Sequence, residues 1–151
     1  MSITIQPGDP HDPQATALLE ASHALMTKLF AADECHFLEI DQLCTPEIRF
    51  FVAREGDRTL GCAALANKGA YGEIKSMFVS PKARGKGVAD LLMSRLDAEA
   101  LEQGLSEMKL ETGDTLDAAI RLYQRHGFTI CEPFGDYELN NASVFMEKSL
   151  E

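Results

Sequence analysis

Apolar residues recur along the chain with two spacings, one typical of strands and one typical of helices. Alternating or short continuous apolar runs predict strands at 2–6, 48–54, 59–66, 73–79, 106–112, 128–131 and 143–148. Apolar residues three or four positions apart predict helices at 14–30, 86–103 and 114–126. The turn Glu55-Gly56-Asp57-Arg58 predicts a hairpin, and we expect Asp114 to cap the last helix. Because hairpins come first and strand–helix–strand crossovers follow, the order predicts an α/β (α+β) fold with helices on both faces of a mixed sheet.

The predicted strand at 73–79 breaks the strict alternation of apolar and polar residues. Ile74 stands at an even position, whereas Met77 and Val79 stand at odd positions. These three side chains can share one face only if a β-bulge inserts an extra residue. Alternatively, the strand is central and apolar on both faces, which Phe78 favours. The pattern alone leaves both alternatives open.

The composition is that of an ordinary globular domain. The 151 residues are 45% hydrophobic and 25% charged, which excludes a disordered chain and predicts a single domain, residues 1–151. We expect no membrane span, because no window approaches about 20 apolar residues, and no signal peptide. The cysteines at 35, 44, 62 and 131 match neither a Cys-x-x-Cys pair nor a zinc-finger spacing. We therefore expect reduced thiols, no metal and a cytoplasmic location.

Charge is distributed unevenly along the chain. The 14 basic and 24 acidic residues give a net charge of -10, which argues against a nucleic-acid partner. Residues 75–89 are the exception, because they hold four basic residues and no acidic one. Within them, the run Arg84-Gly85-Lys86-Gly87-Val88-Ala89 lies between a predicted strand and a predicted helix. Glycines allow backbone N–H groups to approach a ligand, and a helix N-terminus attracts anions, so this run predicts a phosphate or pyrophosphate site.

Two common phosphate-binding motifs do not fit this run. A P-loop requires Ser or Thr after Gly-Lys, where this chain has Gly87. A dinucleotide-binding fingerprint requires a third glycine at the position of Asp90. The site is therefore expected to bind its phosphates in another way.

Residues 73–128 resemble the core of the Gcn5-related N-acetyltransferase (GNAT) superfamily. The acyl-CoA signature of that family, Q/R-x-x-G-x-G/A, matches Arg84 to Ala89, and its later Ala-x-x-Leu-Tyr-x-x-x-Gly-Phe segment matches Ala119 to Phe128. Further runs are similar to a bacterial branch typified by YsnE and extend the resemblance over nearly the whole chain, at 72–77, 110–113, 132–137 and 143–146. One departure is Leu116, because many members have at this position an asparagine that helps to hold the cofactor.

The resemblance implies that acetyl-CoA is the co-substrate. The loop expected to hold its pyrophosphate consists of Arg84, Gly85, Lys86, Gly87, Val88 and Ala89. The pantetheine arm is expected to pair with the backbone of a bulged, splayed central strand, here at Met77, Phe78 and Val79. The resemblance thus favours the bulge over the regular strand.

The resemblance also implies roles for single side chains. Acetylation of an amine needs a base for its proton and an acid for the leaving thiolate. Tyr123 matches the usual general acid of the family, although its place on an apolar helical stripe also fits an ordinary core residue. Glu73 and Glu111 are candidate bases, expected on adjacent strands and facing one cleft, unless they are solvated or ion-paired. Three further residues lie in loops that we expect to close over the acceptor, namely His36, Phe134 and Tyr137.

The expected activity is transfer of an acetyl group from acetyl-CoA to the amine of a small molecule, by direct attack in a ternary complex. One alternative is an acetyltransferase for protein or peptide amines, which the acidic surface would suit. Another is a regulatory module that binds CoA without turnover. A homodimer is common in the family. Four questions are left open. They are the identity of the acceptor, which carboxylate, if any, is the base, which group holds the cofactor in place of the asparagine that Leu116 replaces, and the oligomeric state.

Overall fold

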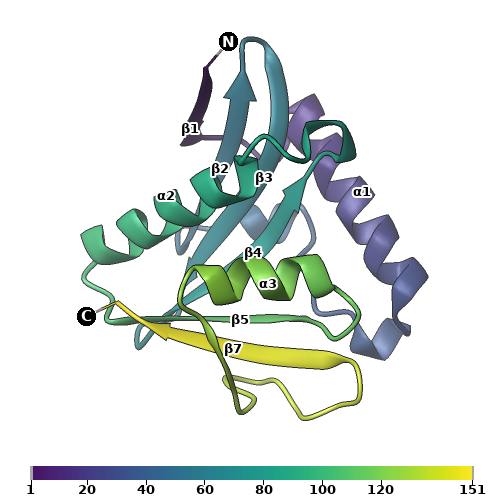
Figure 1. Ribbon diagram of the computed structural model, residues 1–151, viewed down its shortest axis with the longest axis vertical. Helices are drawn as coiled ribbons and strands as arrows, with labels where there is room; N and C mark the ends of the chain where they lie inside the picture. The colour runs from purple at the N-terminus through teal and green to yellow at the C-terminus, as the bar shows by residue number, and fades with distance from the viewer. Residues whose placement is uncertain (1, 151) are drawn as a thin grey trace.

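The predicted strands form one mixed sheet. The computed structural model describes residues 2–150, and within them the strand order is β1-β2-β3-β4-β5-β7-β6 (Figure 1). The strands are β1 (Ile3–Pro7), β2 (Ile48–Glu55), β3 (Arg58–Asn67), β4 (Gly72–Val79), β5 (Glu107–Gly113), β6 (Thr129–Cys131) and β7 (Ser143–Ser149). Only β4 and β5 run parallel, and every other neighbouring pair in this part of the chain is antiparallel. The expected mixed sheet is confirmed.

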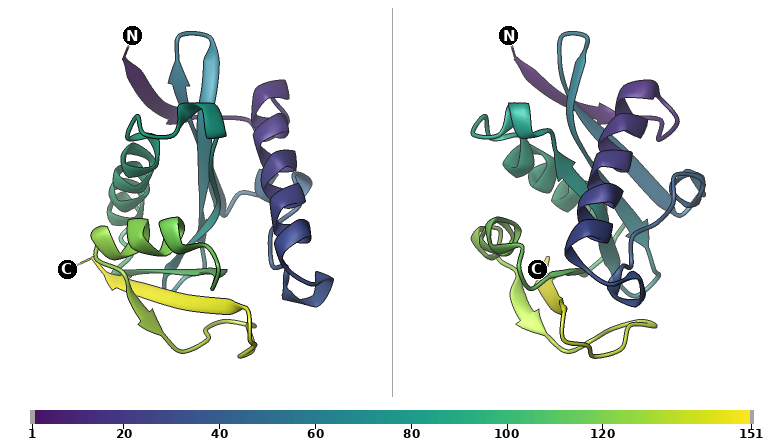
Figure 2. Two further views of the ribbon diagram at one scale, coloured as in Figure 1. Left: turned by 45° about the vertical axis from the view of Figure 1, so that its right-hand side comes forward. Right: turned by 90° about the vertical axis from the view of Figure 1, so that its right-hand side faces the viewer.

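Helices cover both faces of the sheet, as expected. Helix α1 (Pro13–Leu29) lies on one face, and α2 (Val88–Glu102) and α3 (Asp117–Arg125) lie on the other (Figure 2). Under α1 the core contains Leu18, Leu19, Phe50, Val52 and Cys62. Under α2 and α3 the core contains Ile74, Leu92, Leu96, Leu110, Leu122 and Met146. Each face therefore buries the apolar stripe of its own helices, which accounts for the two-sided apolar character of the central strands.

A β-bulge interrupts the pairing of β3 with β4. Cys62 pairs with Phe78 and Ala64 pairs with Lys75, so two residues of β4 lie opposite a single residue of β3. Ser76, inside the bulge, has a φ of 56°, in the left-handed region that a serine rarely adopts. Beyond the bulge the side chains change face, so that Met77 joins Ile74 and Val79 in the core beneath α2. Of the two alternatives for 73–79, the bulge is confirmed.

Strands β4 and β5 part soon after they meet. They pair only at Gly72 with Met108 and at Glu73 with Lys109, within the part of the chain that the structure describes. The edge of β4 that faces β5 is therefore unpaired from Ile74 to Val79. This is the splayed arrangement that the family resemblance implied.

Two helix boundaries differ from those predicted. The predicted helix at 86–103 begins only at Val88, because Gly85 and Gly87 have φ values of 84° and 76°, outside the helical region. The expectation that Asp114 caps the last helix was wrong. Its cap is Leu116, with no side-chain hydrogen bond, and the backbone N–H of Asp114 instead donates to the carbonyl of Ala142 at 2.8 Å. Asp114 is thus part of the β5–α3 connection.

Two expectations about the whole chain can be compared with the described residues. Within residues 2–150, no helix is both long and apolar enough to cross a membrane, and no group of three or more potential ligands could hold a metal ion. The cysteines at 35, 44, 62 and 131 carry free thiols, as expected.

Candidate active site

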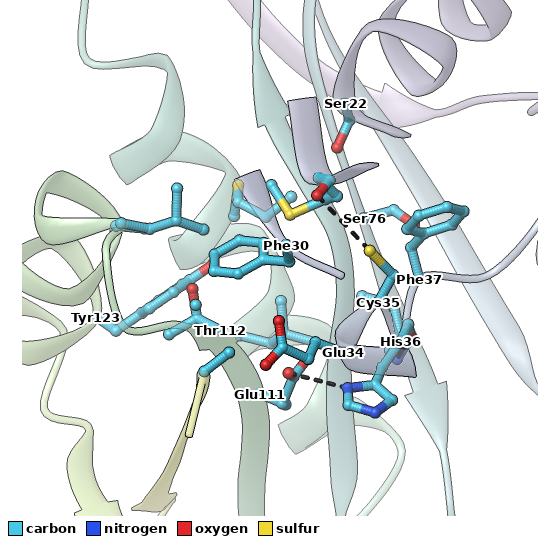
Figure 3. Close-up of a pocket in the computed structure, with 18 residues that line it drawn as sticks. Ser22, Phe30, Glu34, Cys35, His36, Phe37, Ser76, Glu111, Thr112 and Tyr123 are labelled. Carbon is cyan, nitrogen blue, oxygen red and sulfur yellow. Dashed lines mark hydrogen bonds and ion pairs between the residues drawn. The ribbon is translucent and has the colours of Figure 1, made fainter. Parts of the chain in front are cut away.

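A pocket lies where β4 and β5 part, close to the C-terminal end of α1 (Figure 3). Its walls come from α1 and the loop after it, the bulge in β4, the end of β5, and α3. Among the residues selected from the sequence, those that line it are His36, Met77, Glu111, Leu116 and Tyr123. The lining residues within 2–150 do not include Glu73, Phe78, Phe134 or Tyr137.

Tyr123 on α3 is both a core residue and a pocket residue. Its side chain is 6% exposed and packs edge-on against Phe128, so its burial agrees with the structural interpretation. It also lines the pocket, and Figure 3 shows its ring running from α3 toward Phe30. Burial, and next the negative charge of Glu111, raise the pKa of the phenol above its ordinary value. Tyr123 is therefore a protonated hydroxyl at neutral pH.

Glu111, near the end of β5, is a pocket carboxylate held by two donors. Its Oε2 lies 2.6 Å from the hydroxyl oxygen of Ser143 and 3.1 Å from Nδ1 of His36. His36 comes from the loop after α1, and Ser143 begins β7. Ser143 is in turn oriented by the side-chain amide of Asn140, whose Nδ2 lies 3.0 Å from the serine oxygen. Two segments distant from β5 in sequence thus hold this carboxylate in place.

Glu73, the other candidate base, has a different environment. It is 3% exposed, accepts a hydrogen bond from the Tyr137 hydroxyl, and lies 3.4 Å from Nζ of Lys75. Lys75 Nζ also donates to the Tyr137 hydroxyl oxygen at 2.8 Å and to the His36 carbonyl at 3.0 Å. Burial, and next the charge of Glu73, raise the pKa of Tyr137. The expectation that both acids face one cleft was wrong, because only Glu111 lines the pocket and Glu73 belongs to a buried ion pair.

The loop after β6 packs on the sheet and does not close over the pocket. Phe134 is 9% exposed and makes edge-to-face contacts with Tyr71, Tyr137 and Phe145. Tyr137 lies one layer behind the pocket, with its ring edge-on to His36 at 5.3 Å between centroids. This loop therefore supports the pocket wall from behind, and only His36 of the three proposed acceptor residues reaches the pocket.

Several pocket residues could not be selected from the sequence. Phe30, just after α1, lies so close to Gly113 that a Cβ there would collide with its ring. Glu34 comes from the short turn at Ala32–Glu34, in a polar stretch without a recognisable motif. Ser76 in the bulge has a buried hydroxyl with no hydrogen-bond partner among the described residues. The close approach of Phe30 explains why β5 ends in glycine. Gly113 was thus the one feature of the sequence that pointed to a close contact at this place.

The glycine-containing loop, Arg84 to Ala89, follows the C-terminal end of β4. Gly85 and Gly87 have positive φ values, and a Cβ at either would meet open space within 4 Å. Gly87 caps α2 without any side-chain hydrogen bond, so the first N–H groups of the helix are left to other acceptors. Arg84 is exposed, and Lys86 is partly paired with Glu55 at 3.4 Å. The loop presents backbone donors and positive charge together, as an anion site requires.

An ion-pair cluster joins this loop to the helix that carries Tyr123. Asp90, in the first turn of α2, lies 2.7 Å from Nε2 of His126 and 3.1 Å from the Arg125 guanidinium. The hydrogen bond from His126, followed by that from Arg125, lowers the pKa of Asp90 below its ordinary value. The start of α2 and the end of α3 are therefore held together.

Comparison with known protein families agrees with this geometry. The model of the acetyltransferase (GNAT) family matches residues 16–128, which contain the bulge, the glycine-containing loop and Tyr123. The chain belongs to the GNAT family. As a GNAT protein it is an acetyltransferase, since members of the family transfer acetyl groups and its relatives carry that name.

Individual relatives of this GNAT protein match it over nearly their whole length. It is 39% identical to an IAA acetyltransferase of Azospirillum brasilense over 151 residues, which is 99% of each chain. It is 39% identical to YsnE of Bacillus subtilis, an uncharacterized N-acetyltransferase, over 91% of this chain and 93% of that one. A putative acyl-CoA N-acyltransferase from Klebsiella pneumoniae, 28% identical, has the same fold with a TM-score of 0.82 over 99% of this chain and 98% of that one.

The same fold occurs in a solved structure that contains acetyl-CoA. A GNAT acetyltransferase from Elizabethkingia anophelis with acetyl-CoA bound shares the fold, with a TM-score of 0.73, 21% identity and 97% of each chain covered. In the present structure, the edge of β4 that faces β5 is unpaired beyond Glu73, and a Cβ at Gly85 or Gly87 would meet open space within 4 Å. Leu116 lines the pocket with an apolar side chain, so it provides no side-chain hydrogen bond there.

Proposed function

We propose that this protein transfers the acetyl group of acetyl-CoA to the amine of a small molecule, by direct attack in a ternary complex. The observation that carries the proposal is the pocket at the parting of β4 and β5, which has a protonated phenol on one wall and a carboxylate on another. A protein that only bound CoA would not need this pairing of an acid with a base.

The residues proposed to hold acetyl-CoA occupy two places. Backbone groups of Met77, Phe78 and Val79 on the unpaired edge of β4 hold the pantetheine arm. The loop from Arg84 to Ala89 holds the pyrophosphate through its N–H groups and through the positive end of α2. Bound there, acetyl-CoA supplies an activated acetyl group as a thioester.

Tyr123 and Glu111 are proposed to move the two protons of the reaction. Glu111 accepts the proton of the attacking amine, directly or through water, while Ser143 and His36 keep its carboxylate in place. A backbone N–H at the bulge, near Met77, donates to the carbonyl oxygen as negative charge develops on it. Tyr123, whose raised pKa keeps the phenol protonated at neutral pH, gives its proton to the sulfur as the carbon–sulfur bond breaks.

Glu73 is assigned a supporting place in this proposal. Its carboxylate neutralises Lys75 and orients Tyr137 behind the pocket. Removal of one member of a buried ion pair leaves the other charge uncompensated. We therefore expect Glu73 to affect folding more than proton transfer.

The small-molecule acceptor is supported by the names of relatives. The IAA acetyltransferase matches over the whole chain, and a streptothricin acetyltransferase of Streptomyces lavendulae is 34% identical over 55% of this chain and 46% of that one. Both names describe acetyl transfer to small molecules. The pocket is lined by α1 and the loop after it, by β4 and β5 where they part, and by α3, and these walls suit a compact acceptor (Figure 3).

Two measurements test the proposal, and the first is cofactor binding. Acetyl-CoA, and desulfo-CoA as well, should raise the melting temperature, because the phosphates contribute most of the binding. Gly87→Val should abolish this shift. Gly69→Val is the matched control, because Gly69 also has a positive φ and open space but lies in the β3–β4 turn. Stabilisation by NADH or ATP and not by CoA would refute the phosphate-site assignment.

The second measurement is release of CoA in the presence of a panel of amines and amino acids. At least one small amine should support turnover well above the hydrolysis seen without an acceptor. Binding of acetyl-CoA without turnover on any small amine would favour a non-catalytic module. Turnover only on peptide N-termini or lysines would favour a protein acetyltransferase.

A further inference from the structure

Two carboxylates lie at the end of the pocket beside the loop that carries His36 (Figure 3). Glu34 and Glu111 both line the pocket, and Figure 3 shows both carboxylates on the side of the loop that carries His36. Cys35 lines the same pocket, and burial, followed by the charges of Glu111, Glu34 and Asp33, raises the pKa of its thiol. One oxygen of Glu34 accepts the backbone N–H of Ala31 at 3.0 Å, which holds this side chain in place.

The pocket has no free cation to balance these acids. Among the described lining residues, Lys75 is the only lysine or arginine. Its ammonium group has three N–H donors, and the carboxylate of Glu73, the hydroxyl of Tyr137 and the carbonyl of His36 take all three at 3.4, 2.8 and 3.0 Å. His36, the other basic group that faces Glu111, directs its Nδ1 to that carboxylate. No basic side chain of the lining is therefore left to pair with a carboxylate on the acceptor.

The remaining walls of the pocket are mainly apolar. They are formed by Met26, Phe30, Phe37, Met77 and Leu116. Phe37 is held in place by stacking on His23, with ring centroids 4.1 Å apart and planes at 12°. Phe30 is pressed against the backbone of Gly113. A cavity with apolar walls and a few polar groups at one end selects a ligand with an apolar body and one polar group.

We propose that the acceptor is a primary amine with an apolar body and no carboxylate, and that the corresponding amino acid is rejected. This inference rests on the proposed function and names the acceptor class of the same pocket. Glu34 and Glu111 attract the ammonium group. Glu111 takes one proton to give the neutral amine that attacks the thioester, and the second nitrogen proton passes through water to the phenolate that is left when Tyr123 protonates the leaving thiolate. A carboxylate on the acceptor would instead enter a site that already holds two negative charges, with no cation to pair with.

Matched pairs of acceptors test the inference. Phenethylamine differs from phenylalanine, and isoamylamine from leucine, by a single carboxylate. We expect kcat/KM for each amine to exceed that for its amino acid by on the order of 100-fold, the size expected for one uncompensated charge in a partly buried site. Phenylalaninamide, which keeps the size of the amino acid without its charge, should be accepted like the amine.

A variant of one pocket acid makes the test specific. Glu34→Gln keeps an oxygen for the Ala31 N–H and removes one charge, so it should narrow the ratio between amine and amino acid by about tenfold. Asp33→Asn is the control, because Asp33 is the exposed neighbouring acid outside the pocket lining, and it should change the ratio much less than Glu34→Gln does.

The outcomes separate this inference from the proposed function. If phenylalanine and leucine are acetylated as well as their amines, the inference is overturned while the proposed activity stands. An unchanged ratio in Glu34→Gln would also overturn it. If the protein binds acetyl-CoA but neither the amines nor the amino acids support CoA release, the proposed function itself fails.

Discussion

At the scale of single residues, Tyr123 shows how packing and chemistry can share one side chain. Its ring belongs to the core beneath α2 and α3, while its hydroxyl belongs to the pocket. Burial serves both, because it stabilises the fold and keeps the phenol protonated. The helical stripe in the sequence could reveal only the first of these uses, and the family motif supplied the second.

Tyr123→Phe removes the hydroxyl and keeps the ring, so it separates the two uses. We expect turnover to fall by about 10- to 1000-fold, as for the loss of a general acid, with little change in acetyl-CoA affinity or melting temperature. Steady-state kinetics with an accepted amine, together with a melting curve, check this. Tyr71→Phe, a tyrosine outside the pocket lining, should leave turnover unchanged. Full turnover in Tyr123→Phe would reduce Tyr123 to a core residue.

The two candidate bases show where prediction from sequence reaches its limit. Glu73 and Glu111 both stand in strands beside the expected bulge, and nothing local distinguishes them. They differ because Tyr137 and Lys75 surround Glu73, whereas His36 and Ser143 hold Glu111 at the pocket. These partners come from loops distant in sequence, whose course depends on tertiary packing. The sequence therefore predicted two candidate carboxylates, but it could not predict which of them lines the pocket.

At the scale of elements, most strands and helices were predictable because their signals are local. The apolar spacing of α1 and the hairpin at Gly56 need no information from distant residues. The start of α3 was mispredicted because Asp114 is engaged by Ala142, which lies just before β7. The bulge was left open by the pattern and needed the family resemblance. Elements were thus predictable wherever the decisive contact lies within the element.

The junction of α2 and α3 gives a pH dependence at this scale. The pKa of Asp90 is lowered in the folded protein, chiefly by the hydrogen bond from His126. Its contribution to stability is therefore present above the ordinary carboxyl pKa of about 3.9 and is lost as the pH falls through the lower folded value. We expect Asp90→Asn to lower the melting temperature by roughly 2 °C near pH 6, because the pair is half exposed.

Melting curves of wild type and Asp90→Asn between pH 7 and about pH 3 check this dependence. The difference should shrink toward zero at the acid end. Asp117→Asn, in the exposed first turn of α3, is the matched control for a carboxylate at a helix N-terminus and should show a smaller difference. A difference for Asp90→Asn that grew toward low pH would contradict the assignment.

At the scale of the whole molecule, charge is arranged so that the two proposed substrates meet different electrostatic fields. The net charge of -10 and the acidic pocket attract cations, while the basic loop at 82–86 provides local positive charge for phosphates. The sequence could predict the basic loop, because its residues are contiguous. The acidic pocket could not be predicted, because Glu34 and Glu111 meet only in the folded chain.

Salt should therefore act differently on the two substrates. We expect kcat/KM for a cationic amine to fall several-fold between low salt and about 0.5 M salt, with kcat nearly constant, because salt screens attraction at long range. The KM for acetyl-CoA should change less. Salt screens both the repulsion of its phosphates by the negatively charged protein and their attraction by the basic loop, and these two effects oppose each other. An amine that is neutral at the assay pH is the control. Equal salt dependence for cationic and neutral amines would contradict the argument.

The short junction between β4 and β5 has a consequence for the cooperativity of unfolding. Two residue pairs join the half-sheet of β1–β4 to the half-sheet of β5, β7 and β6, so the hydrogen-bonded ladder contributes little to holding the halves together. Side-chain packing beneath α2 and α3 supplies most of that connection. A ligand arm that paired with the free edge of β4 would add contacts across this junction. Its concentration would then decide whether the two halves open separately or as one cooperative unit.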